Sequence, residues 1–168
     1  MKRQILAGLA LLLFGTATRG QNTPAADFSL GYSAIKFDEN LGRTAYGGSS
    51  TVALNVNRWL GAVGDFGLYH TSYIAPGLAA GTYMFGPRFS YRHWNRFNPF
   101  TQVLLGGARS GVNALAFGAG GGVEFTLDQR GRFAVRPQIE YLGFRANGGT
   151  TNTLRVGVAF VLRTGRRF

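Results

Sequence analysis

The stretch from Arg155 to Leu162, RVGVAFVL, decides the fold of this chain. Side chains of an extended strand point alternately to its two faces, so every second residue shares a face. One face of this strand carries Val156, Val158, Phe160 and Leu162, and the other carries Arg155 and small side chains. The same alternation recurs along most of the chain. A face this apolar predicts contact with lipid, provided that the chain is exported.

The first 20 residues have the pattern of a cleavable secretory signal peptide. Lys2 and Arg3 give it a positive start, and the apolar run over 5–14 is too short for a transmembrane helix. We expect cleavage after Gly20. The absence of cysteine excludes a disulfide framework and a lipid-anchored cysteine.

The positive charge of the chain does not indicate nucleic-acid binding, although the formal net charge is +11. The arginines are scattered singly through the pattern instead of clustering on one element, and an exported protein meets little nucleic acid. Outer-membrane lipid and anionic lipopolysaccharide are the partners that we expect for this charge.

Beyond the signal, the pattern predicts eight strands, each about as long as a tilted strand needs to cross a bilayer. They lie at 28–36, 49–58, 62–71, 82–92, 99–109, 115–127, 132–144 and 153–163. The fold class is therefore all-β: an eight-stranded antiparallel up-and-down transmembrane β-barrel preceded by a signal peptide. The predicted segments are the signal peptide (1–20), a lead-in (21–27), the barrel (28–163) and a short basic tail (164–168).

The links between these strands alternate in length. Short links are predicted near 59–61, 93–98 and 128–131, and longer polar links at 38–46, 73–80, 110–113 and 146–152. Short periplasmic turns and longer outer loops are typical of outer-membrane barrels. The outer loops are where we expect any surface partner to bind.

Strong charges in the middle of strands all fall on the face away from lipid. An eight-stranded barrel has just enough room inside for its own side chains, so these charges must pair there. We predict a lumen network that places Asp65 opposite Arg88, Glu124 opposite Arg136 and Glu140 opposite Arg155. Its seven members are Asp65, Arg88, Gln102, Glu124, Arg136, Glu140 and Arg155.

Aromatic side chains and two prolines mark other features of the predicted barrel. An interfacial girdle near the short turns is predicted from Trp59, Trp94, Phe97, Phe100 and Phe133. Pro87 and Pro137 fall inside predicted strands, where each leaves a ladder hydrogen bond unmade. We interpret the two prolines as bulges or register breaks.

The last strand also fits the assembly signal of bacterial outer-membrane barrels, through Arg155, Gly157, Phe160 and Leu162, and the chain ends in Phe168. With the signal peptide and the strand count, the chain resembles the small eight-stranded barrels related to the membrane domain of outer membrane protein A and to outer membrane protein X. This resemblance implies a bacterial outer-membrane location, the barrel assembly machinery as a partner and a monomer. It also implies a non-enzymatic role in envelope integrity or surface adhesion.

Two alternatives remain open. His70 and Ser72 are similar to the His-x-Ser pair of outer-membrane lipid A deacylases, but no Asp or Glu lies between Asp65 and Glu124 to orient the histidine. The other alternative is a secreted lipocalin-like barrel that binds an apolar ligand. No cofactor and no metal site are predicted, because two isolated histidines without cysteines offer no ligand set.

Overall fold

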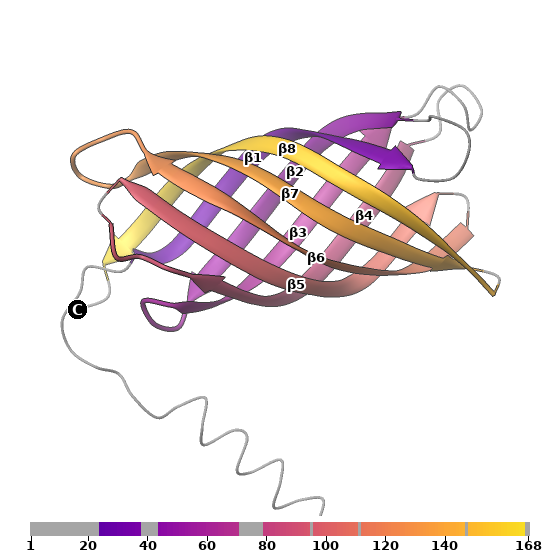
Figure 1. Ribbon diagram of the computed structural model, residues 1–168, viewed down its shortest axis with the longest axis horizontal. Helices are drawn as coiled ribbons and strands as arrows, with labels where there is room; N and C mark the ends of the chain where they lie inside the picture. Colours follow the sequence, from indigo (N-terminus) through magenta and orange to yellow (C-terminus); the bar gives the residue numbers. More distant parts are fainter. Residues whose placement is uncertain are drawn as a thin grey trace, which may run out of the picture.

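The computed structural model describes residues 24–37, 44–70, 79–94, 96–110, 112–146 and 148–166. In them, eight antiparallel strands form one closed barrel, in which each strand pairs with its sequence neighbours and β8 closes on β1 (Figure 1). The strands are β1 (Pro24–Phe37), β2 (Thr44–Asn55), β3 (Leu60–His70), β4 (Ala79–Ser90), β5 (Phe97–Ser110), β6 (Val112–Thr126), β7 (Phe133–Ala146) and β8 (Gly149–Arg166). The predicted all-β, eight-stranded antiparallel barrel is confirmed. Among the described residues, no helix is long and apolar enough to cross a membrane.

The two ends of the barrel are built differently (Figure 1). At one end β1 begins and β8 ends, and the connections at 56–59, 91–96 and 127–132 lie with them. We call this the termini end. The opposite end, which we call the loop end, carries the links at 38–43, 71–78, 111 and 147–148.

Several strands extend beyond their predicted bounds. β1 begins at Pro24, so the end of the predicted lead-in is strand. β8 continues to Arg166, so most of the predicted basic tail is strand as well. These strands are longer because pairing with the neighbouring strand still satisfies the hydrogen-bonding groups of the backbone beyond the part that spans the bilayer. The alternation of inward and outward side chains continues there as well. The predicted signal peptide and Phe168 lie outside the described residues.

The predicted long outer link at 146–152 is wrong, because this connection is a tight hairpin, and the link at 110–113 is also tighter than predicted. Ser110 pairs with Val112, and Ala146 pairs with Gly149. Gly148 has a positive φ of 81°, a conformation that glycine adopts without strain. The dipeptide at 147–148 is Asn-Gly, which favours two-residue hairpins, and this signal shows that a short connection was predictable here.

The strands alternate between an exposed apolar face and a buried face, as predicted. Leu30, Leu68, Leu105 and Val158 point outward and are 56–71 % exposed. A closed barrel has no free sheet edge, so the large apolar surface is the outer wall itself. This wall is continuous around all eight strands.

Four of the five predicted girdle aromatics face outward at the termini end. Trp59 stacks on Phe89 with ring centroids 6.2 Å apart, and the ring centroids of Trp94 and Phe97 are 5.5 Å apart. Phe100 does not belong to the girdle, because its side chain lies in the lumen and is only 6 % exposed. Its position two residues before the buried Gln102 places it on the inner face.

The prolines do not shift the register. On either side of Pro87, Phe85 pairs with Leu105 and Arg88 with Gln102, and both pairs have the same register. The ladder is interrupted only between them, on the side where proline has no N–H to donate. The proline of β7 interrupts the pairing with β6 in the same way. The predicted bulges are therefore wrong.

Candidate functional site

The barrel lumen holds the chemistry-bearing side chains of this chain. The seven residues of the predicted network come from six strands, β3 to β8, and none of them is more than 2 % exposed. Such burial of ionised groups is costly unless partners are close. The contacts divide these residues into two clusters and one bridging side chain.

The first cluster surrounds Arg155. Its Nε donates to Glu140 Oε2 at 2.6 Å, and its Nη1 donates to Asp65 Oδ1 at 2.7 Å and to the Tyr69 hydroxyl at 3.1 Å. Glu140 lies directly opposite Arg155 in the β7–β8 ladder. Asp65 reaches the same guanidinium across the lumen from β3. One arginine thus forms ion pairs with two buried carboxylates.

The predicted pairing of Asp65 with Arg88 is wrong. Asp65 lies opposite Met84, and Arg88 lies opposite Gly61. Side chains repeat with a period of two, so a register displaced by an even number of residues keeps every side chain on its predicted face. Alternation alone therefore does not distinguish the two registers. The turn that sets the register, at 71–78, lies outside the described residues.

The second cluster surrounds Glu124. Arg136 donates to Glu124 Oε1 from Nε at 2.9 Å and from Nη2 at 2.6 Å, and Arg163 Nη2 donates to Oε2 at 2.5 Å. Arg136 Nη1 also donates to Ser29 Oγ at 3.2 Å and to Thr51 Oγ1 at 3.0 Å. Glu124 and Arg136 were expected to meet across the β6–β7 hairpin. The second arginine was not.

Gln102 joins the two clusters. Its Oε1 accepts from Arg88 Nε at 2.8 Å, and its Nε2 donates to Glu140 Oε1 at 2.6 Å. The Phe100 ring lies beneath two guanidinium groups, 4.7 Å from that of Arg88 and 5.2 Å from that of Arg136. Its π face is an attractive surface for both cations, which otherwise repel each other. The result is one continuous polar network through the middle of the lumen.

A third group of side chains lies at the termini end. Arg92 Nη2 donates to Asp27 Oδ2 at 3.1 Å and to Asn55 Oδ1 at 3.0 Å, and Asn55 Nδ2 donates to Asp27 Oδ2 at 3.0 Å. Sequence reasoning missed Asp27, Arg92 and Arg163 as lumen residues. Arg92 and Arg163 are the last residues of the predicted strands 82–92 and 153–163 and fall on their inner faces by alternation, and Asp27 falls on the inner face once β1 is extended to Pro24.

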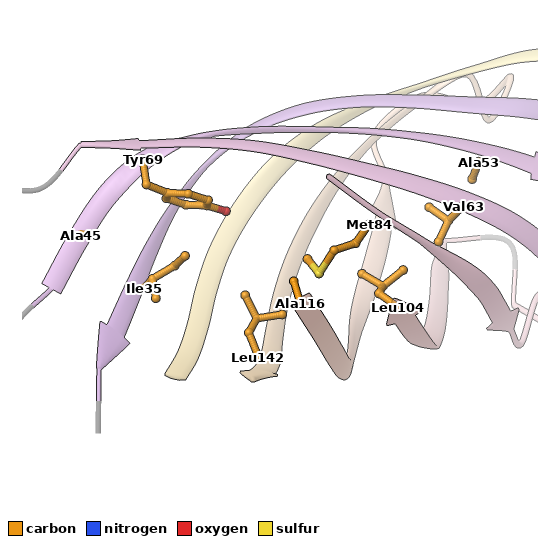
Figure 2. Close-up of a cluster of buried hydrophobic side chains, with 9 residues drawn as sticks. All are labelled: Ile35, Ala45, Ala53, Val63, Tyr69, Met84, Leu104, Ala116 and Leu142. Atoms are coloured by element: carbon orange, nitrogen blue, oxygen red, sulfur yellow. The ribbon is translucent and has the colours of Figure 1, made fainter. Parts of the chain in front are cut away.

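The loop end of the lumen is apolar instead of polar. Ile35, Tyr69, Met84, Leu104 and Leu142 are at most 3 % exposed and gather inside the barrel wall (Figure 2). The partly buried rings of Phe37 and Phe144 pack against this cluster. We call it the apolar cap. The predicted network of charges fills the middle of the lumen, and the apolar cap beyond it was not predicted.

The predicted His-x-Ser pair is only half described. His70 is exposed at the end of β3, opposite Tyr46, and Ser72 lies outside the described residues. Within the described chain, His70 makes no ion pair with a carboxylate. In the same residues, no group of three His, Cys, Asp or Glu side chains is placed to hold a metal ion.

Solved structures with the same architecture include bacterial outer-membrane proteins. Neisserial surface protein A matches with a TM-score of 0.63 at 11 % identity, covering 86 % of this chain and 99 % of its own. The chain has the fold of the small outer-membrane barrels. Ail, the attachment invasion locus protein of Yersinia pestis, matches with a TM-score of 0.53 at 14 % identity, covering 83 % of this chain and 100 % of its own.

The N-terminal β-barrel domain of Pseudomonas aeruginosa OprF is a third example. It matches with a TM-score of 0.54 at 12 % identity, covering 84 % of this chain and 100 % of its own. Neither protein-family sequence models nor curated protein sequences match the chain. At such low identity, the likeness extends to the fold and not to individual residues.

Proposed function

We propose that this chain is a non-enzymatic, non-conducting barrel of the bacterial outer membrane with a structural role in the envelope. The observation that carries this proposal is the filled lumen. Ion-paired arginines and carboxylates occupy its middle, and the apolar cap occupies its loop end. We expect that hydrated ions find no open path through this packed filling.

The orientation and the location of the barrel belong to the same proposal. The outer wall is apolar and the lumen carries buried charges, which is the reverse of a soluble lipocalin-like barrel. The longest link of the barrel, at 71–78, joins strands at the loop end, and longer links are typical of the outer side of outer-membrane barrels, although the loop-end links at 111 and 147–148 are short. We therefore place the termini end in the periplasm and the loop end at the cell surface, with delivery by the signal peptide and the barrel assembly machinery.

Electrical recording across a planar bilayer tests the closed lumen. The purified, folded barrel is expected to produce no stepwise current above that of the bilayer alone. The matched control replaces Leu104 and Leu142 of the apolar cap with serine, which exchanges apolar filling for small polar groups. Steady single-channel steps from the unaltered barrel, with no increase in the double variant, would contradict a closed lumen.

A surface-contact role is a second candidate, and the charge of the loop end favours it. Lys36, Arg109 and Arg145 are exposed there, at the ends of β1, β5 and β7. The sequence of the adjoining link at 38–43 adds Asp38, Glu39 and Arg43, so four basic residues stand against two acidic ones at this end. The Yersinia Ail barrel has been solved in complex with the heparin analogue sucrose octasulfate. We propose that the loop end of this chain binds sulfated polyanions in the same general manner.

Labelled heparin on whole bacteria tests this second role, because only the surface-exposed end is accessible there. Arg109→Gln with Arg145→Gln is expected to lower heparin binding about fivefold or more, since exposed charges contribute additively to polyanion attraction. Arg130→Gln with Arg132→Gln removes the same charge at the opposite end and is expected to change nothing. Equal binding by both double variants would refute loop-end recognition.

A further inference from the structure

A basic groove lies at the termini end, between the β6–β7 turn and the end of β8. Its volume is about 970 Å³. Six side chains characterise it: Arg92, Arg130, Arg132, Arg163, Trp94 and Phe133. Arginine guanidinium groups therefore dominate its polar lining, and no carboxylate is part of it.

Arg163, which is buried, and Arg92, which is partly buried, form the floor of the groove, and each has one donor without a partner among the described residues. Arg163 is 8 % exposed, and its Nη2 is bound to Glu124, but its buried Nε has no hydrogen-bond partner. Arg92 donates from Nη2 to Asp27, while its buried Nη1 has no partner either. A buried charged donor without an acceptor is costly, so the floor favours a ligand that supplies anionic oxygens.

The distribution of charge in the lumen also favours an anionic ligand in the groove. Around Arg155, two carboxylates meet one arginine. Toward the termini end, the two carboxylates Asp27 and Glu124 meet four arginines. Burial lowers the pKa of the Arg92 guanidinium, and the Asp27 carboxylate acts in the opposite direction. The unbalanced positive charge therefore lies beside the groove.

The rim of the groove adds two more cations. Arg130 and Arg132 are exposed on the β6–β7 turn, and Arg132 lies 5.9 Å from the centre of the Phe133 ring. In the same turn, Asp128 Oδ1 accepts the Phe133 N–H at 2.8 Å, which ties this carboxylate to the backbone. The exposed arginines are thus free to reach toward a ligand.

The wall of the groove is apolar and continues onto the lipid face. Trp94 and Leu162 are 50 % and 40 % exposed. Phe133 pairs with Leu162 in the β7–β8 ladder and stacks on Phe160 at 5.7 Å. Aromatic side chains of this kind are typical of the membrane–water interface. The groove therefore joins the basic end of the lumen to the apolar outer wall.

We propose that this groove binds the phosphate headgroup of an anionic phospholipid, with the acyl chains along Leu162 and Phe160. The guanidinium fork matches phosphate oxygens in geometry and charge, and the apolar wall accepts the hydrocarbon. A soluble phosphate ion would use only the basic part of the groove. The inference rests on the proposed membrane location, because that location places the groove beside the periplasmic leaflet.

Native mass spectrometry of the folded barrel in micelles, titrated with phosphatidylglycerol or phosphatidylcholine, tests the inference. Folding is established first by heat-dependent gel mobility, so that failure of the membrane proposal is recognised separately. The unaltered barrel is expected to retain phosphatidylglycerol selectively. Arg130→Gln with Arg132→Gln is expected to weaken that binding about fivefold per arginine. These two side chains make no lumen contacts, so the variant keeps its fold.

Three results would overturn the inference. One is equal retention of phosphatidylcholine, which carries no net charge. Another is an equal loss in the Arg109→Gln, Arg145→Gln control, which would reduce the effect to overall charge. The third is displacement of the lipid by inorganic phosphate at millimolar concentration, which would assign the groove to a soluble ion.

Discussion

Replacing Arg155 with methionine is expected to lower the free energy of unfolding by about 3–5 kcal/mol, because it strands two buried carboxylates. Arg155 forms ion pairs with Asp65 and Glu140 at the same time, and all three side chains are at most 2 % exposed. Methionine preserves much of the volume, so the loss measures charge compensation more than packing. Urea unfolding in phosphatidylcholine vesicles, followed by the fluorescence of the two tryptophans, gives the value.

A double-mutant cycle separates this pairing from general damage. Glu140→Gln combined with Arg155→Met is expected to cost less than the sum of the two single changes, because the double variant leaves one stranded carboxylate fewer. Arg130→Met, at an exposed position on the β6–β7 turn, is the control and is expected to change stability by less than about 0.5 kcal/mol. Strict additivity would mean that Glu140 and Arg155 do not interact.

Replacing Phe160 with aspartate is expected to prevent efficient assembly. Phe160 is 49 % exposed on the outer wall of β8 and stacks on Phe133. A charge on the lipid face costs on the order of 1–4 kcal/mol, depending on depth, and the aromatic contact with lipid is lost as well. The yield of heat-modifiable barrel in membranes measures the effect. Thr164→Asp, further along the same outward face, is the control and is expected to assemble.

A second variant tests whether the last strand is also an assembly signal, which remains a proposal. Leu30 lies opposite Phe160 in the β1–β8 ladder, is 71 % exposed and is not part of the signal octet. Leu30→Asp is expected to destabilise the barrel in vesicles about as much as Phe160→Asp. In cells, Phe160→Asp is expected to assemble less well. Equal yields of the two variants in cells would argue against a signal in β8.

Where one face of a strand is polar, alternation alone could predict which side chains face lipid and which face the lumen. Glu140 and Arg155, for example, lie on inner faces of the strands that close the last hairpin. The register of their hairpin was also predictable, because the same register places Glu140 opposite Arg155 and keeps the apolar side chains on the outer face. The β3–β4 register was not, because two registers that differ by an even number of residues keep Asp65 and Arg88 inside.

The apolar cap could not be predicted from the sequence, for a related reason. Near the loop end, both faces of several strands are apolar: Met84 points inward between Tyr83 and Phe85, which point outward. Without a polar partner face, alternation gives no contrast to identify the inner side chains. The basic groove was not predicted because Arg92 and Arg163 are the end residues of their predicted strands. Only charges in the middle of strands were assigned to the lumen. Strand bounds are the part that local sequence predicts least well.

Cell fractionation of the unaltered chain, combined with gel mobility before and after heating, tests whether the apolar face of the barrel meets lipid while the charged face lines its lumen. We expect a detergent-extractable protein in the outer-membrane fraction whose mobility changes on boiling, because a folded barrel resists unfolding by detergent until it is heated. Recovery as a soluble periplasmic protein would contradict it and would favour the lipocalin-like alternative.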